Sequence, residues 1–223
     1  MVERKVYYSF HDMPSSQGIT QSYTSGSRLR FSRTEVMHIL IAIGVLTVAF
    51  SFAITPGYPS MVGFFEVVEY IPLAFIAIVT AFFCHEMAHK YMGQKYGYWS
   101  EFRMFPMGLL FALFLGVAFG FVFAAPGAVQ IFGNANREEE GKISVAGPLM
   151  NLIVALLCLP VMYISSDVIK EFVSFICYIN AFLAFFNLIP FGPLDGGKIL
   201  RWRLDVWASL IAVSIGLIII VPL

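Results

Sequence analysis

Five long stretches of this chain contain no Asp, Glu, Lys or Arg, and this limits the folds open to it more than any other feature. They cover residues 36–65, 104–136, 143–166, 172–194 and 206–223. Apolar stretches of this length are typical of helices that span a membrane. Of the 223 residues, 59% are hydrophobic and only 13% are charged, unlike an ordinary soluble domain. The sequence therefore predicts an all-α polytopic protein of the cell membrane.

The chain divides near residue 28. Residues 1–27 are polar and rich in Ser, Thr, Gln and Tyr, and we expect a polar N-terminal tail there. Residues 28–223 are expected to form one transmembrane domain. Ser32 and Glu35 match the capping-box pattern at the start of its first helix. The formal net charge is zero, which gives no reason to expect nucleic acid as a partner.

The sequence predicts five to six transmembrane helices, and the number depends on residues 104–125. Basic residues near span ends favour the cytoplasm for the N-terminus, residues 97–103, the turn at 134–142 and the loop at 198–203. These assignments agree only if 104–125 is a re-entrant element that does not cross. The expected spans are 36–54, 68–96, 143–165, 172–190 and 204–222. The basic residues used are Arg28, Arg30, Arg33, Lys90, Lys95, Arg103, Arg137, Lys142, Lys198, Arg201 and Arg203.

A charged cluster interrupts the second expected span. No Asp, Glu, Lys, Arg or His lies between Tyr70 and Cys84, and then His85, Glu86 and His89 follow within five positions. Such a cluster is costly in a membrane helix and indicates a functional site. Two histidines four residues apart lie on one helical face and can share a metal ion, while the glutamate can reach a water on that metal.

A catalytic zinc needs a third protein ligand and an open position for water. His11 lies in the polar tail and His38 at the start of the first span, so neither is a good candidate. Asp195 follows two prolines and precedes two glycines, which places a carboxylate at the unwound end of an apolar helix. If 104–125 is re-entrant, Asp195 lies at the same membrane depth as the two histidines.

Three motifs together resemble the site-2 protease family of intramembrane zinc metalloproteases. They are the HExxH pattern in a membrane helix, Gly147-Pro148 opening a later helix, and NxxPxxxxDGG beginning at Asn187. The resemblance covers the chain from about Arg28 onward. It implies cleavage of transmembrane segments of membrane-bound protein substrates inside the bilayer.

The resemblance also implies residue roles. His85, His89 and Asp195 would bind one zinc per chain, Glu86 would activate the water, and Asn187 would hold the substrate or the developing oxyanion. The extended segment Pro126–Ile131 resembles the family's membrane-embedded strand, which pairs with an unwound substrate. The substrate-binding residues expected on this basis are Pro126, Gly127, Ala128, Val129, Asn151 and Asn187.

Other interpretations stay open at this stage. The same buried polar residues would suit a polytopic metal transporter or channel without proteolytic activity, although they gather at one depth rather than along a path. A catalytically inactive protein of the same fold is disfavoured because Glu86 accompanies all three ligands. Asn151 and Asn187 could instead form hydrogen bonds between helices. The apolar insertion at 107–125 departs from the family pattern.

Overall fold

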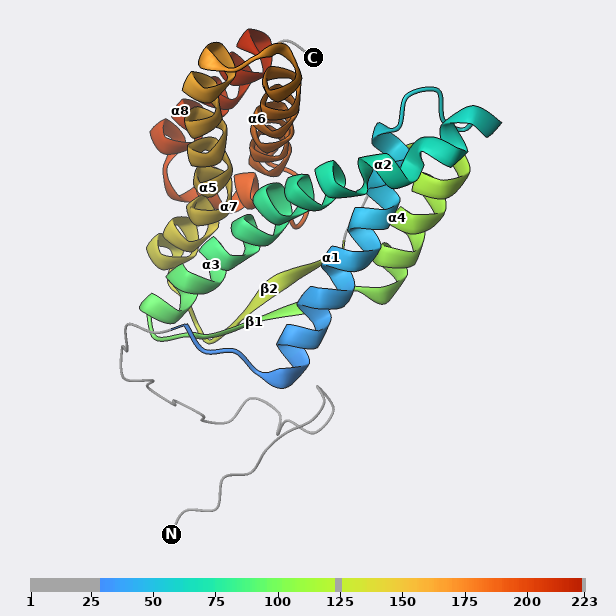
Figure 1. The fold of residues 1–223 in the computed structure, drawn as a ribbon. Helices are drawn as coiled ribbons and strands as arrows, with labels where there is room; N and C mark the ends of the chain where they lie inside the picture. Colours follow the sequence, from blue (N-terminus) through green and yellow to red (C-terminus); the bar gives the residue numbers. More distant parts are fainter. Residues whose placement is uncertain (1–28, 123–125, 222–223) are drawn as a thin grey trace.

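The computed structural model of the protein describes residues 29–122 and 126–221. The tail expected at residues 1–27 lies outside the described residues and stays a prediction. The described chain is mostly helical, with one small sheet (Figure 1). Its elements are α1 (Arg33–Ile54), α2 (Met61–Ile78), the π-helix η2 (Val79–Phe83), α3 (Cys84–Lys95), β1 (Trp99–Met104), α4 (Pro106–Phe119), β2 (Gly127–Phe132), α5 (Arg137–Ile164), α6 (Asp167–Leu188), α7 (Asp195–Trp202) and α8 (Leu204–Ile220).

Four helices are long and apolar enough to cross a membrane. Three of them are α1, α5 and α6, and the fourth is the continuous helix Gly63–Lys95 that contains most of α2 together with η2 and α3. Helices α4 and α8 are apolar but shorter, with 14 and 17 residues. The predicted helical membrane protein is therefore confirmed, whereas a count of five or six spans stays a prediction.

The helices form two groups, each with its own apolar core. Figure 1 shows α5, α6, α7 and α8 on one side, α1, α2 and α4 on the other, and α3 running between them. The first core joins α5, α6 and α8 through Leu152, Met162, Ala181, Ala184 and Leu217. The second core joins α1, β1 and α4 through Ile39, Ala42, Leu46, Phe102, Leu109 and Ala112. The helix that carries the histidines thus lies at the seam between two packed units.

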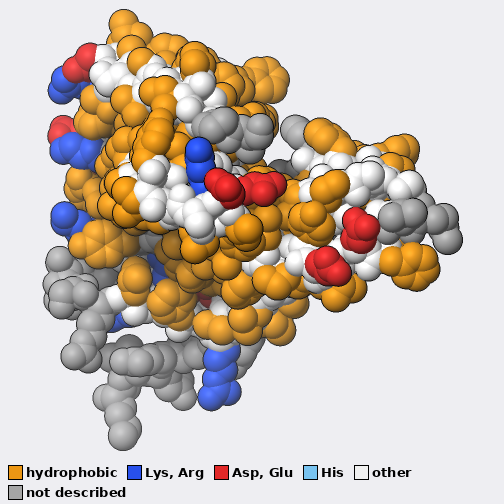
Figure 2. Space-filling model, turned by 45° about the horizontal axis from the view of Figure 1, so that its top comes forward, with side chains coloured by type: hydrophobic (Ala, Val, Ile, Leu, Met, Phe, Trp, Pro, Cys, Tyr) orange, Lys and Arg blue, Asp and Glu red, His pale blue; other side chains and the backbone are white. Residues whose placement is uncertain are grey.

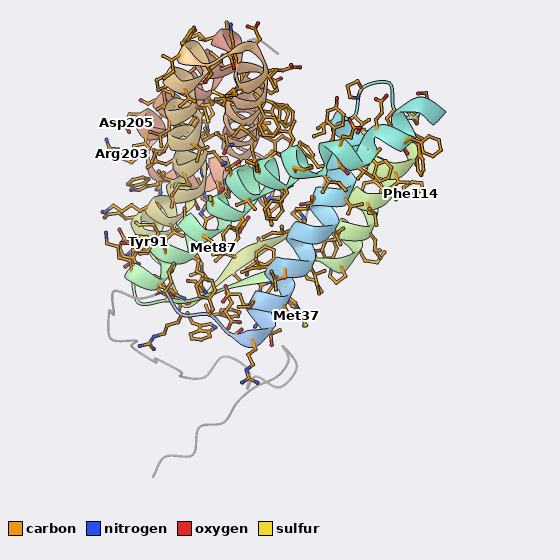
Figure 3. All side chains as sticks on the ribbon, in the orientation of Figure 1. Met37, Met87, Tyr91, Phe114, Arg203 and Asp205 are labelled. Atoms are coloured by element: carbon orange, nitrogen blue, oxygen red, sulfur yellow. The ribbon has the colours of Figure 1, made fainter. Side chains whose placement is uncertain are left out.

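Large apolar side chains cover much of the outer surface. Figure 2 shows hydrophobic side chains over most of the face in view, with acidic and basic side chains in a few separate groups. On α4, Phe114 points outward and is 59% exposed, and Tyr91 of α3 is also exposed (Figure 3). A soluble protein rarely leaves so much apolar area in contact with water. The surface therefore agrees with a chain surrounded by lipid.

The sheet consists of two antiparallel strands at the end of the bundle where α1 begins. Trp99 of β1 is opposite Phe132 of β2, and Met104 is opposite Gly127. The segment predicted to be extended at Pro126–Ile131 is therefore β2, while its partner β1 falls in the region that the sequence indicated as a loop. Next to the sheet, the Tyr98 hydroxyl donates to the Glu139 carboxylate at 2.7 Å, which raises the pKa of Tyr98.

The insertion between the two strands leaves the sheet and returns to it. Met104 pairs with Gly127, and the Phe105 N–H donates to the Pro126 carbonyl at 2.9 Å, so residues 105–126 begin and end at one place. Between these points α4 runs beside α1, and near its far end the Tyr58 hydroxyl donates to the Val117 carbonyl. The insertion therefore begins and ends at the same end of the helical bundle.

Candidate metal centre

Two elements far apart in sequence bring three potential ligands together. His85 and His89 project from α3, and their Nε2 atoms lie 3.0 Å apart. Asp195 is the first residue of α7, and its Oδ2 lies 3.4 Å from Nε2 of His85 and 3.1 Å from Nε2 of His89. The three side chains are 5%, 10% and 12% exposed. Within the described residues, this is the group of His, Cys, Asp and Glu side chains that could hold a metal ion.

The donors fit zinc in both type and spacing. Two imidazoles and a carboxylate form a common catalytic zinc set, and tetrahedral bonds of about 2.0–2.1 Å would separate the donor atoms by about 3.3 Å. Gly147 of α5 keeps the neighbouring space open. A Cβ at Gly147 would lie 2.3 Å from Nε2 of His89 and 2.5 Å from Nε2 of His85. A side chain there would therefore occupy the position that the two ring nitrogens face.

Helix α5 also contacts the opposite nitrogen of each histidine ring. Nδ1 of His85 lies 2.6 Å from Oδ1 of Asn151, and Nδ1 of His89 lies 2.8 Å from the carbonyl of Ile143. Because each partner is an acceptor, each Nδ1 carries the hydrogen and each Nε2 is left with a lone pair. This is the usual way in which an outer partner fixes a metal-binding histidine.

Glu86 points to a different strip of α3 and contacts the sheet. Its Oε2 accepts a hydrogen bond of 2.8 Å from the backbone N–H of Val129 in β2, and the residue is buried. The contact joins the acidic residue of the HExxH motif to the strand that was predicted to bind substrate. It holds one carboxylate oxygen and leaves the other for a second partner.

A buried ion pair lies one turn further along the same strip. Lys90 Nζ lies 2.8 Å from the carboxylate of Glu35 in α1 and donates to the Ser100 carbonyl at 2.7 Å. Glu35 accepts the N–H of Phe102 at 2.9 Å, and both charged side chains are completely buried. Lys90 therefore gives no evidence about the cytoplasmic side, contrary to its use as a topology signal. Only half of the predicted capping box forms, with the Ser32 hydroxyl accepting from the Glu35 N–H.

The break before Asp195 depends on close packing with the end of α6. A Cβ at Gly196 would lie 2.0 Å from the Leu188 carbonyl, and that carbonyl also accepts from the Trp207 indole at 2.7 Å. These contacts require a glycine directly after the aspartate. On the last turn of α6, the amide of Asn187 donates to the Leu183 carbonyl at 3.0 Å, and no contact of Asn187 with the three potential ligands is observed.

Several residues of the site were not singled out from sequence. Glu35 and Lys90 were interpreted only as a cap and a topology signal, and Asn180 and Thr80 were not considered. Asn180 accepts a hydrogen bond from Asn151, the partner of His85, and donates one to the Thr80 hydroxyl. The available signal was a polar residue, Asn180, in the middle of an otherwise apolar span.

Comparison with known proteins gives a consistent result. Residues 160–222 match the model of peptidase family M50, a region that includes Asp195. The chain is 38% identical over 185 residues to a Methanocaldococcus jannaschii protein named "Putative zinc metalloprotease MJ0611", covering 82% of this chain and 91% of that one. It is 31% identical over 130 residues to "Zinc metalloprotease MJ0392" of the same organism, covering 57% and 33%. No solved structure matches the chain.

Proposed function

The chain belongs to peptidase family M50, the site-2 proteases, and is an intramembrane zinc metalloprotease; on this premise we propose the roles of its individual residues. His85, His89 and Asp195 hold the zinc, and Glu86 is the general base. The observation that carries this assignment is the convergence of three donor atoms from α3 and α7 beside the gap at Gly147. The substrates are membrane-bound proteins whose transmembrane segments enter this site.

Glu86 moves the proton in this mechanism. Zinc, when bound, acts as a Lewis acid that acidifies the attacking water and polarises the scissile carbonyl. Because Oε2 of Glu86 is held by the Val129 N–H, Oε1 is the atom that takes the proton from the water. The same oxygen then returns the proton to the leaving amine. The hydrogen bond from Val129 also stabilises the ionised carboxylate that the first step needs.

An unwound substrate needs a hydrogen-bonding partner inside the membrane. A helix conceals its peptide bonds, and unwinding it in lipid leaves N–H and C=O groups that cost several kcal/mol each when unpaired. We assign β2 as that partner because the other edge of the sheet is occupied. Two outward backbone groups of β1 already have partners: the Ser100 carbonyl accepts from Lys90, and the Phe102 N–H donates to Glu35.

The register of the sheet selects which β2 residues can pair with substrate. Outward and inward groups alternate along an antiparallel strand, and Val129 faces outward because its N–H reaches Glu86. The backbone groups of Gly127 and Ile131 also point outward. Those of Ala128 point toward β1, where Ala128 lies opposite Arg103. The Pro126 carbonyl accepts from Phe105. Backbone pairing is therefore assigned to Gly127 and Ile131, with Ala128 and Pro126 contacting substrate through their side chains.

Asn187 is assigned to the developing oxyanion. An amide NH2 group has two donors, and the bond to the Leu183 carbonyl uses one of them. A donor of this kind contributes about 3–4 kcal/mol to the transition state in comparable hydrolases. Asn187 lies on the last turn of α6, before the segment that presents Asp195.

We also propose five spans, with residues 105–126 re-entrant and the N-terminus in the cytoplasm. The return of residues 105–126 to the sheet supports this topology, since Lys95 and Arg103 then lie on the same side as the turn before α5. Cysteine introduced at Asn136 should not react with an impermeant maleimide added outside cells. If Asn136→Cys were labelled from outside while Ser60→Cys was not, the chain would have the opposite orientation to the one proposed.

The assignment of Glu86 is tested with Glu86→Gln in the purified chain. The variant keeps the three ligands, so it should bind one zinc and lose hydrolysis of a transmembrane peptide by about 10²–10⁴-fold. Loss of zinc from the folded variant would show that Glu86 is a ligand instead. Zinc uptake into vesicles that contain the protein, without peptide cleavage by the wild type, would support the transporter alternative.

A further inference from the structure

We propose that Asn180 is a positioning residue for the metal centre, acting with Thr80 through Asn151 on the ligand His85. The proposal rests on His85 being a zinc ligand. The observation behind it is a chain of hydrogen bonds from the ring of His85, across α5 and α6, to the π-helix that precedes the histidines. Asn151 and Asn180 are both completely buried, so each polar atom has to find its partner within the protein.

The chain of contacts can be followed atom by atom. Nδ1 of His85 lies 2.6 Å from Oδ1 of Asn151. Nδ2 of Asn151 lies 3.0 Å from Oδ1 of Asn180 and 2.8 Å from the carbonyl of Ala81. Nδ2 of Asn180 lies 2.9 Å from the Ile176 carbonyl and 3.2 Å from Oγ1 of Thr80. Every donor of the two amides therefore has an acceptor.

The direction of each bond is fixed by backbone carbonyls, which can only accept. The Thr80 hydroxyl donates to the Ile76 carbonyl, so it accepts from Asn180. Asn180 uses its NH2 group on Thr80 and Ile176, which turns its Oδ1 toward Asn151. The NH2 group of Asn151 donates to Oδ1 of Asn180 and to the Ala81 carbonyl, so both of its hydrogens are used. The Oδ1 atom of Asn151 therefore faces His85.

The consequence is a single tautomer for His85. An Asn151 oxygen facing Nδ1 requires the hydrogen to sit on Nδ1, and Nε2 then offers its lone pair to the metal. If Asn180 could not accept, the Ala81 carbonyl alone would oppose turning over of the Asn151 amide, and the flipped amide, which presents NH2 to the ring, would be more populated. Nδ1 would then be the acceptor and Nε2 would carry the hydrogen, which prevents metal binding. Asn180 thus favours the binding-competent tautomer without touching the metal centre.

The second histidine does not depend on such a chain. Nδ1 of His89 contacts the Ile143 carbonyl directly, and a carbonyl cannot turn over into a donor. The dependence on side chains is therefore specific to His85. It also gives a role to the π-helix, because Thr80 and Ala81 both lie in η2 and supply two of the fixed acceptors. Single π-turns of this kind are frequently found at functional sites.

The test measures zinc affinity by chelator competition in the purified full-length chain, together with the absorption spectrum of the cobalt form and the unfolding temperature without metal. Loss of an outer partner typically weakens metal binding by about 10–100-fold, so Asn151→Leu should fall in that range. Asn180→Leu should weaken zinc binding by several-fold to about tenfold and alter the cobalt spectrum. Thr80→Val should have a smaller effect in the same direction.

Two variants separate positioning from a packing role. Asn180→Asp, protonated in this apolar setting, retains an oxygen that accepts from Asn151 and should restore zinc affinity close to that of the wild type. Ser214→Ala removes a buried hydroxyl that donates to the Ile211 carbonyl of its own helix, and should leave zinc affinity unchanged. Recovery with Asn180→Asp and not with Asn180→Leu supports the proposal.

The proposal and the assignment of the metal centre fail in different ways. If His85→Ala retains zinc with wild-type affinity, His85 is not a ligand and the metal centre itself is wrongly assigned. If His85→Ala loses zinc while Asn180→Leu keeps wild-type affinity and spectrum, the centre stands and the positioning role is overturned. A lower unfolding temperature of the metal-free Asn180→Leu protein, without a change in affinity, also overturns it.

Discussion

The two polar strips of α3 are supported in different ways. On one strip, His85 and His89 meet acceptors from α5 and a carboxylate from α7, in the seam beside the larger helical group. On the other, Glu86 and Lys90 meet backbone groups of the sheet and a carboxylate from α1. One short helix therefore joins a candidate metal centre built by helices to a carboxylate positioned by a strand.

This difference indicates that metal binding and substrate handling can be disturbed separately. The two histidines contact Asp195 of α7 and, through their Nδ1 atoms, groups of α5, and these contacts do not involve the sheet. The sheet holds Glu86 and presents β2, but it supplies no donor to the metal centre. Changes on the α5 side should therefore remove zinc, while changes on the sheet side should leave zinc bound and impair cleavage or stability.

The largest effect is expected on the α5 side, from Gly147→Ala. The new Cβ would lie within 2.5 Å of both Nε2 atoms, far inside van der Waals contact, so the histidines cannot keep their positions around a metal. Zinc and peptide cleavage should both be lost to below detection. Metal analysis of the purified variant measures this directly. Gly44→Ala is the matched control, because a Cβ there meets nothing within 4 Å, and it should keep zinc and activity.

On the sheet side, Lys90→Met should destabilise the protein and retain zinc. Removing one member of a completely buried ion pair costs about 3–5 kcal/mol, because the buried Glu35 carboxylate keeps the Phe102 N–H but loses the opposite charge of Lys90. The variant should unfold at a markedly lower temperature and bind one zinc while it stays folded. The double variant Glu35→Leu with Lys90→Met should recover part of this loss. A double variant less stable than either single variant would contradict this interpretation of the pair.

A smaller and more specific effect is expected from Val129→Pro. Proline removes the N–H that donates to Glu86, and no bond between the strands is lost because that N–H faces outward. A hydrogen bond to a charged group contributes about 1.5–3 kcal/mol, which corresponds to a decrease in kcat of about 10–100-fold.

Ile131→Pro is the matched comparison for Val129→Pro. It removes another outward N–H of β2, one that does not reach Glu86. Its effect should fall on KM rather than on kcat, because this group is assigned to substrate pairing. If both variants changed only KM, the contact between Val129 and Glu86 would have no part in catalysis.

Much of this arrangement could be predicted from sequence because it depends on local patterns. The charge-free stretches at 36–65, 143–166 and 172–194 correspond to α1, α5 and α6, and the uncharged run between Tyr70 and Cys84 lies within the Gly63–Lys95 helix. The HExxH spacing places both histidines on one face, and the prolines before Asp195 mark the break that presents it. The length of an apolar segment and its helical periodicity are properties of that segment alone, so they can be recognised without knowing which other segments it packs against.

The remaining features depend on contacts between distant segments. Strand β1 is six residues long and contains Glu101 and Arg103, so nothing in its own composition distinguishes it from a loop. Glu35 lies three residues after Ser32, the spacing of a capping box, but its carboxylate accepts a hydrogen bond from Lys90 of α3 instead of capping the helix. Asn180 is polar within an apolar span, a pattern equally typical of a simple bond between helices. The relation of these residues to the metal centre appears only when α5 and α6 are in place.

Paired measurements of zinc content and cleavage show whether the two strips of α3 act separately. Zinc content and peptide cleavage are determined on the same preparations of the wild type, Val129→Pro and Gly147→Ala. We expect one zinc per chain in the wild type and in Val129→Pro, with cleavage impaired in the latter, and no zinc in Gly147→Ala. Loss of zinc from folded Val129→Pro, in parallel with its activity, would contradict it.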